Sequence, residues 1–136
     1  MNTVHQLHAL TPEHVEALAD VLIDCVEGGA SVSFMLPMTR DKAIGFWRGV
    51  GPGVAAGERA LLVARDAQGT IVGTVQLLLA QPENQPHRAD LAKLLVHRRA
   101  RGQGLGDALM QTIEPLARAA GKRLLVLDTA SAAAEK

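Results

Sequence analysis

The chain has little with which to bind nucleic acids or membrane surfaces. Aromatic residues make up 2% of its 136 residues, and tyrosine is absent. Lys and Arg together number 14, as do Asp and Glu, so the formal net charge is zero. Nucleic-acid and anionic-membrane binding depend on excess positive charge and, for single strands, on stacking aromatics. We therefore expect neither nucleic acid nor membrane as a partner.

Cysteine and long apolar runs are also scarce. The only cysteine, Cys25, excludes an internal disulfide, and His5, His8 and His14 lack a ligand-like spacing, so no metal site is expected. No apolar run approaches the roughly 20 residues of a membrane span, and no charged, then apolar leader follows Met1. With 48% hydrophobic residues, the chain suits one cytoplasmic domain over residues 1–136.

The first third of the chain predicts an edge strand over residues 2–9 and then a helix. Thr11 is the expected N-cap, Pro12 the first helical residue, and Gly28-Gly29 the end, in the left-handed conformation. The residues expected to face the core are Val15, Leu18, Leu22, Cys25 and Val26. The residues expected to face water are Glu16, Asp20, Asp24 and Glu27.

Residues 30–38 are apolar but follow neither the helical nor the strand period, which indicates packing under the next helix or a substrate-pocket wall. Thr39 predicts the cap of a second helix over residues 40–50, with Trp47 inward, which the glycines and proline of residues 49–53 should break. Strands are then expected at 58–65 and 70–80, joined as an antiparallel hairpin by residues 66–69.

The second half predicts a βαβ unit, from a strand at 89–96, a helix from Leu105 to Gly121 and a parallel strand at 122–128. The residues expected on the apolar face of the helix are Leu105, Leu109, Ile113, Leu116 and Ala120. Pro115 lies off that face, so we expect it to kink the helix rather than end it.

The connection between strand and helix, residues 98–106, is basic and punctuated by glycine. Backbone N–H groups at a helix start lack internal partners and carry partial positive charge, and glycine lets a phosphate approach them closely. This pattern predicts a pyrophosphate cradle, against the alternative of an ordinary glycine-rich connection. No Lys-Ser or Lys-Thr follows the glycines, and the G-x-G-x-x-G spacing fails at Asp107 and Leu109, so neither common nucleotide motif applies.

The spacing R-x-x-G-x-G is met by Arg101, Gly104 and Gly106. It resembles the coenzyme A loop of the GCN5-related N-acetyltransferases (GNAT), and the order of expected elements is similar over nearly the whole chain. The resemblance implies an α/β, GNAT-like acyl-CoA N-acyltransferase fold, with a mostly antiparallel sheet whose strands 89–96 and 123–128 run parallel and splay apart. It also implies acetyl-CoA as co-substrate, bound by Leu94, Leu95, Val96, Arg101, Gly102, Gln103, Gly104, Leu105 and Gly106.

Residues 28–35, 92–96 and 127–129 are similar to the tabtoxin resistance subgroup, which acetylates small amino compounds. The implied reaction is direct attack of a neutral acceptor amine on the thioester, with a backbone N–H near Leu95 stabilising the oxyanion. Asp128 and Asp90 are the candidate bases. Either carboxylate could instead be an ordinary strand-end or surface group.

The chain departs from the family where a helix carrying a proton-donating tyrosine and two more strands are expected. It has no tyrosine and stops at Lys136, so it resembles a C-terminally shortened member. The edge of strand 123–128 should then be covered by a second chain, as a homodimer or another edge-paired assembly. A non-catalytic acyl-CoA-binding module is the alternative function, and a nucleotide-binding α/β domain with Asp128 on a ribose is a third.

Overall fold

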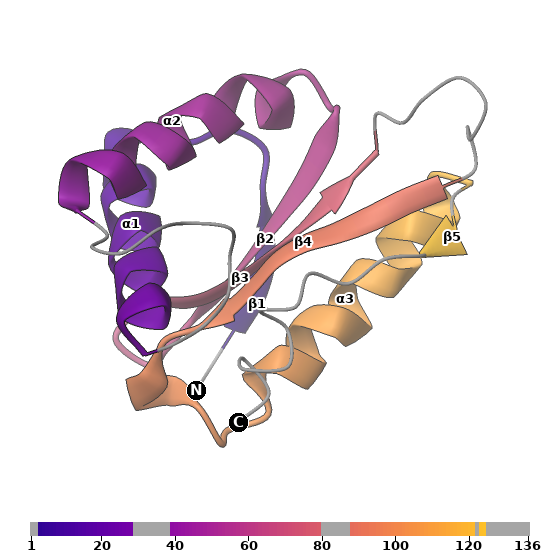
Figure 1. Ribbon diagram of the computed structural model, residues 1–136. Coiled ribbons are helices and arrows are strands. Elements are labelled where there is room, and N and C mark those ends of the chain that lie inside the picture. The colour runs from indigo at the N-terminus through magenta and orange to yellow at the C-terminus, as the bar shows by residue number, and fades with distance from the viewer. Residues whose placement is uncertain (1–2, 29–38, 80–87, 122, 125–136) are drawn as a thin grey trace.

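Helices cover both faces of one mixed sheet in the computed structural model, which describes residues 3–28, 39–79, 88–121 and 123–124 (Figure 1). The elements are β1 (Thr3–Leu7), α1 (Pro12–Glu27), α2 (Arg40–Ala55), β2 (Arg59–Arg65), β3 (Ile71–Leu78), β4 (Arg88–Val96), a 3-10 turn (Arg98–Ala100), α3 (Leu105–Ala119) and β5 (Arg123–Leu124). Within the described ranges, no helix is long and apolar enough to cross a membrane.

The strands lie in the order β1-β2-β3-β4-β5. The first four pair antiparallel with their neighbours, and β4 pairs parallel with β5 through Arg88 opposite Arg123 and Ala89 opposite Leu124. This arrangement confirms the predicted mixed, mostly antiparallel sheet with a parallel last pair. It excludes the doubly wound nucleotide-binding alternative, whose sheet would be mostly parallel. Lys122 and residues 125–128 of the predicted last strand lie outside the described residues.

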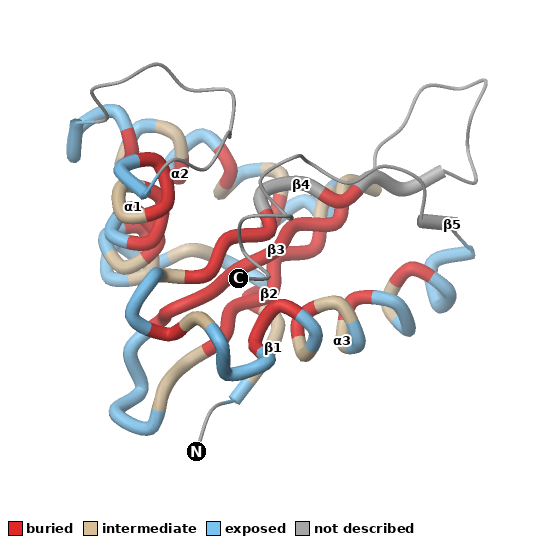
Figure 2. Tube along the Cα trace, turned by 60° about the horizontal axis from the view of Figure 1, so that its bottom comes forward, coloured by how far each residue is buried: buried red, intermediate tan, exposed pale blue. Residues whose placement is uncertain are grey.

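The sheet has a hydrophobic core on each face because side chains alternate along its strands. In β2, Leu61 and Val63 are buried against α1 and α2, whereas Leu62 and Ala64 are buried against α3. Figure 2 shows buried residues along the central strands and on the side of α3 that faces the sheet. A strand covered on both faces is apolar without alternation, which explains the continuous run in β2.

Helix α1 begins as its sequence predicts. The hydroxyl of Thr11 accepts a hydrogen bond from the His14 backbone at 3.2 Å, and His14 Nδ1 accepts one from the Thr11 backbone at 3.1 Å. The predicted left-handed helix end is wrong at Gly28, whose φ is −81°. The Gly28 N–H still bonds the Asp24 carbonyl at 2.9 Å, so the chain continues right-handed there. Gly29 lies outside the described residues.

Helix α2 is longer than the sequence predicts. It was expected to end near Val50 but continues to Ala55, with Pro52 inside. Trp47, Val50 and Val54 are buried on one face. Burying each valine is worth about 1.5–3 kcal/mol, which offsets a mid-helix proline cost of roughly 3 kcal/mol. Packing therefore overrides the local helix-breaking signal.

The hairpin between β2 and β3 is confirmed. One carboxylate oxygen of Asp66 accepts hydrogen bonds from the Gln68 and Thr70 backbones at 2.9 and 3.0 Å, and Gly69 takes a φ of 82°. These bonds hold the pKa of Asp66 below its ordinary value, the Thr70 bond contributing most. The turn is therefore held by an ionised carboxylate.

Helix α3 packs against the sheet through a narrower stripe than predicted. Its buried large residues recur every four positions, whereas Leu116 is only half-buried and Ala120 is exposed. The helix continues through Pro115 as predicted and gives way at Gly121, whose φ is 71°. The buried residues of α3 are Leu105, Gly106, Leu109, Ile113 and Ala117.

Candidate functional site

A small cavity lies where β4 ends and α3 begins. Its volume is about 260 Å³. Of the residues predicted to bind CoA, Leu94 and Leu95 lie in β4 with their side chains buried, and Gln103 is exposed on the loop. The cavity is lined by Val96, Arg101, Gly102, Gly104, Leu105, Gly106 and Asp107. The structure therefore brings most of the predicted loop residues together around one concave space.

The backbone at this cavity is shaped to receive an anion. Gly104 is the N-cap of α3 in the left-handed conformation, with φ 76° and ψ 17°, and Gly102 has φ 81°. The first intrahelical bond runs from the Ala108 N–H to the Gly104 carbonyl at 3.0 Å. The N–H groups of the first turn thus have no carbonyl partner inside the helix, and the helix dipole places partial positive charge on them. A Cβ on Gly104 would meet no atom within 4 Å, so this side of the loop is open.

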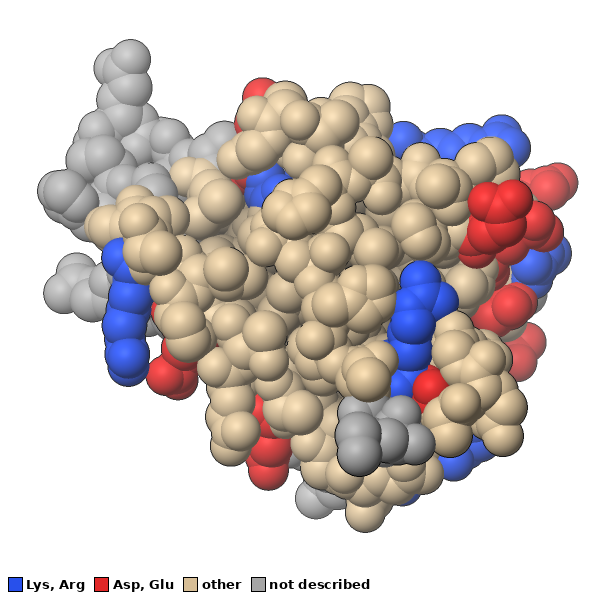
Figure 3. Space-filling model, turned by 180° about the vertical axis from the view of Figure 1, so that it is seen from behind, with Lys and Arg blue, Asp and Glu red and all other residues tan. Residues whose placement is uncertain are grey.

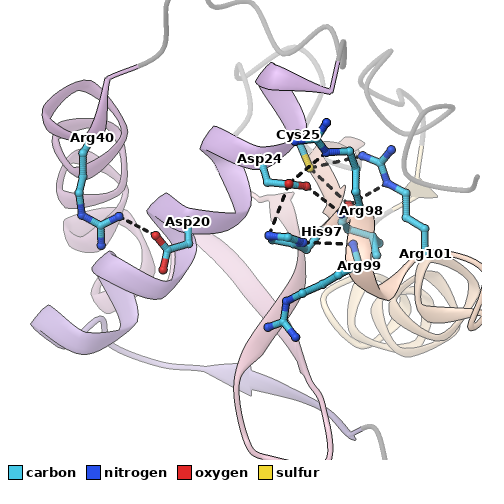
Figure 4. Close-up of polar contacts among 9 residues, drawn as sticks. Asp20, Asp24, Cys25, Arg40, His97, Arg98, Arg99 and Arg101 are labelled. Carbon is cyan, nitrogen blue, oxygen red and sulfur yellow. Dashed lines mark hydrogen bonds and ion pairs between the residues drawn. The ribbon is translucent and has the colours of Figure 1, made fainter.

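Arg101 is anchored to the end of β4. Its Nε donates to the Val96 carbonyl at 2.9 Å, and its Nη2 lies 3.7 Å from the sulfur of Cys25 (Figure 4). The Cys25 thiol donates to the same carbonyl at 3.4 Å. The guanidinium of Arg101 is thereby held against the cavity wall and the last turn of α1.

Cys25 is a core residue, as its position on the apolar face predicts. It is 1% exposed, and burial raises the pKa of its thiol above the ordinary value despite the neighbouring Arg101. A thiolate is the nucleophilic form of cysteine, so this side chain is a poor nucleophile at neutral pH.

The prediction that Asp24 faces water is wrong, because the strand–helix loop covers it. Its side chain is 12% exposed. One carboxylate oxygen accepts the Arg98 backbone N–H at 2.8 Å, and the other accepts Arg98 Nε at 3.0 Å and lies 3.5 Å from His97 Nε2. Helical periodicity alone could not reveal these contacts, which join positions 74 residues apart.

His97, which the sequence analysis did not single out, lies between Asp24 and the basic turn. Its Nδ1 accepts the Arg99 backbone N–H at 3.2 Å, so the neutral ring carries its proton on Nε2, toward Asp24. Burial lowers the pKa of His97, and the charges of Arg99 and Arg98 act in the same direction, whereas Asp24 opposes them. The neutral form is therefore favoured near pH 7.

The predicted oxyanion donor lies beside an irregularity in β4. Thr74 of β3 pairs with Leu95, whereas Gln76 pairs with Ala92, so two β4 residues lie opposite the single residue Val75. Such a bulge interrupts the ladder of backbone hydrogen bonds. Asp90 lies on β4 opposite Leu78, with its backbone alone described, and Asp128 lies outside the described residues.

A larger cavity lies elsewhere in the described part of the chain. It has a volume of about 680 Å³ and lies between the first turns of α1 and the far end of α2, against Val15 and Trp47. Most of the face seen from behind carries neither basic nor acidic side chains (Figure 3). Size alone does not make this cavity the reaction site, because it lies away from the glycine loop between β4 and α3 and shares no lining residue with the cavity there. Among the described residues, no group of three or more His, Cys, Asp or Glu could hold a metal ion.

A mixed sheet that ends in a parallel pair, with a glycine loop opening a helix beside it, defines an acyl-CoA N-acyltransferase fold. The model of the acetyltransferase (GNAT) family matches residues 10–135, and the chain belongs to this family.

Known proteins support this assignment. The chain is 34% identical over 128 residues to an uncharacterized N-acetyltransferase from the hisH-hisA intergenic region of Azospirillum brasilense, covering 93% of this chain and 74% of that protein. A GCN5-related N-acetyltransferase from Kribbella flavida superposes with a TM-score of 0.69 at 25% identity, over 90% of this chain and 69% of that one. A Salmonella typhimurium structure, solved with its cofactor acetyl-CoA, superposes with a TM-score of 0.70 at 16% identity, over 93% and 69% of the two chains.

The family makes the chain an N-acetyltransferase, for which acetyl-CoA is the expected co-substrate. The loop fits this molecule, since Gly102, Gly104 and the first turn of α3 line one cavity, and the first N–H groups of a helix have no carbonyl partner inside it. Asp107 places a carboxylate in the same turn, so backbone amides rather than excess side-chain charge must supply most of the attraction for a phosphate.

Proposed function

We propose that the chain transfers the acetyl group of acetyl-CoA to the amine of a small molecule. The observation that carries the proposal is the 260 Å³ cavity between β4 and the N-terminus of α3. The backbone amides of residues 102–106 bind the CoA pyrophosphate, and Arg101 closes one wall. The backbone of Leu94, Leu95 and Val96 binds the pantetheine arm.

The reaction is direct attack of the acceptor nitrogen on the thioester carbonyl, after which the C–S bond breaks and the CoA thiolate leaves, to be protonated by water. A bulge beside Leu95 supports its proposed role, because backbone N–H groups at a bulge are released from the sheet ladder and can donate to an oxyanion. Cys25, the only thiol, is buried and protonated, so an acyl-enzyme on cysteine is not part of the mechanism. Asp128, or else Asp90, removes the proton that the amine loses.

The acceptor that we propose is a small amino compound of the tabtoxin or antibiotic type. Support comes from the similarity of residues 28–35, 92–96 and 127–129 to the tabtoxin resistance subgroup. We further propose that residues 1–136 form one domain, which acts in the cytoplasm as a homodimer or edge-paired assembly.

A non-catalytic acyl-CoA-binding module is the second candidate function. The absence of tyrosine from residues 1–136 favours it, because no side chain of that type within this stretch can protonate the departing CoA thiolate. Both candidates require the loop to bind CoA, and they differ only in turnover.

The test is to incubate the purified chain with acetyl-CoA and a panel of small amines, and to detect acetylated products by mass spectrometry. An acetylated amine that requires the protein supports the enzyme. Saturable acetyl-CoA binding without any product from the panel supports the binding module. Light scattering on the same sample tests the dimer, which a stable monomer would contradict.

A further inference from the structure

The last turn of α1 contacts the start of the proposed CoA loop, residues 97–106. Within the described residues, this turn contacts the loop through Asp24, Cys25 and Gly28. Figure 4 shows Asp24 and Cys25 pointing toward the same short stretch, residues 97–101. These contacts join the end of α1 to the loop that lines the cavity at the start of α3.

We propose that Asp24 is a positioning residue, which holds residues 97–99 so that the loop beyond them is ready to bind CoA. This inference rests on the proposed function of the loop.

Both oxygens of the Asp24 carboxylate bind Arg98, and we call this pair of contacts the bracket. The carboxylate accepts the Arg98 backbone N–H at 2.8 Å on one oxygen and the Arg98 Nε at 3.0 Å on the other. The backbone bond fixes the first residue of the 3-10 turn, and the ion pair fixes the same residue's side chain. Hydrogen bonds to a charged group are worth more than neutral ones, and this carboxylate is only 12% exposed, so water competes weakly for it.

Gly28 provides the space for this bracket. A Cβ at Gly28 would lie 2.9 Å from Arg98 Cδ, so the arginine stem rests directly on the end of α1. The opposite side of the turn is tied separately, since Arg99 Nη1 lies 3.3 Å from an Asp66 carboxylate oxygen at the β2–β3 hairpin. The turn is thus held from two elements, and Asp24 supplies the shorter and more buried contacts.

Without these contacts to Asp24, a smaller fraction of molecules should hold the loop in the conformation that binds CoA. Apparent affinity falls in proportion to the fraction of molecules in the competent conformation. Removing two hydrogen bonds to a charged acceptor should lower that fraction enough to weaken CoA binding about tenfold. Asp24→Asn keeps an acceptor for the Arg98 amide but loses the ion pair, so its effect should be smaller than that of Asp24→Ala.

Asp20 supplies a matched control. It lies one turn earlier on α1 and pairs with Arg40 of α2, with a side chain that is 60% exposed. Asp20→Ala removes the same group from the same helix, but the partner that it loses is Arg40 of α2 rather than Arg98 of the loop.

The experiment measures CoA affinity by calorimetry, and it measures tryptic cleavage after Arg98 and Arg99 without CoA, mapped by mass spectrometry. We expect Asp24→Ala to weaken CoA binding about tenfold and to speed cleavage at both arginines, with Asp20→Ala like the wild type. If Asp24→Ala does not fold, Asp24→Asn is expected to show both effects at smaller size.

Three outcomes would overturn the inference. A folded Asp24 variant with wild-type affinity and cleavage would show that the bracket holds nothing. Faster cleavage with unchanged affinity would show a structural role only. A change equal to that of Asp20→Ala would assign the effect to helix charge. If the wild type fails to bind CoA, the proposed function fails on its own, and unchanged cleavage in Asp24→Ala would still contradict the bracket separately.

Discussion

Gly104 allows the CoA cradle to be tested by adding a single methyl group. Gly104→Ala places a Cβ where the structure has open space beside the first turn of α3. Gly57, after α2, has nearly the same φ, 77° against 76°, and a Cβ there also meets no atom within 4 Å. Gly57→Ala is therefore a control with the same backbone strain but without the loop.

Gly104→Ala and Gly57→Ala should lower the stability of the protein equally, but only Gly104→Ala should lower its affinity for CoA. A non-glycine residue in the left-handed region costs roughly 1–2 kcal/mol, so both should lower the free energy of unfolding by about that amount. Hydrogen bonds to a charged group are worth about 1.5–3 kcal/mol, and keeping the phosphate from even one amide should weaken CoA binding by roughly 10- to 100-fold. Only Gly104→Ala should show this second effect.

The assay pairs urea unfolding with calorimetric titration of CoA for the wild type and both variants. Alanine is preferable to valine at Gly104, because a β-branched residue is a stronger outlier at positive φ. The cradle would be refuted if folded Gly104→Ala bound CoA with wild-type affinity, or lost no more affinity than Gly57→Ala.

Three further predictions concern the rest of the chain. Thr11→Ala should lower the free energy of unfolding by about 1 kcal/mol in urea titrations, because α1 loses its N-cap. Cys25 should react with a thiol reagent only as fast as the protein unfolds, because it is 1% exposed and burial raises its pKa. The free energy of unfolding should fall as the pH is lowered from about 7 to 5, because the folded pKa of His97 lies below the ordinary value of about 6.5.

The pH prediction follows from proton uptake. As the pH falls through about 6.5, His97 in the unfolded chain binds a proton before His97 in the folded protein does. Proton uptake therefore favours the unfolded state, and the free energy of unfolding falls between about pH 6.5 and the lower pKa of the folded state. His97→Asn keeps an acceptor for the Arg99 amide and should flatten this part of the profile. An unchanged slope in that variant would contradict the assignment of the pH dependence to His97. Rapid labelling of Cys25 in urea-free buffer would contradict its burial, and a Thr11→Ala protein as stable as the wild type would contradict the N-cap prediction.

Local patterns in the sequence predicted most of the elements and the open glycine loop at the start of α3, whose binding of CoA stays a prediction. Strand positions came from apolar runs, such as the run in β2 that is buried on both faces, and the start of α1 came from Thr11 followed by Pro12. The cradle came from the position of glycines between a strand and a helix, because both the left-handed conformation and the open backbone are properties of glycine itself. Signals of this kind lie within a few residues of the feature they predict.

The misses concern contacts between distant parts of the chain. The end of α2 was placed too early because Pro52 and its neighbouring glycines are local breakers, whereas the burial of Val54 is a tertiary effect. Asp24 was assigned to water because its helical position is polar, and the loop that covers it lies 74 residues away. Arg101 was expected at a phosphate, and the structure adds an anchor on the Val96 carbonyl that no spacing rule contains.

The most direct test of the central claim is a calorimetric titration of CoA into the purified chain, with NAD titrated in parallel. We expect saturable binding of CoA at one site per chain and no comparable binding of NAD, because Arg101, Gly104 and Gly106 have the spacing of a CoA loop and not of a dinucleotide fingerprint. A folded protein that binds no CoA, or binds both molecules equally, would contradict this claim.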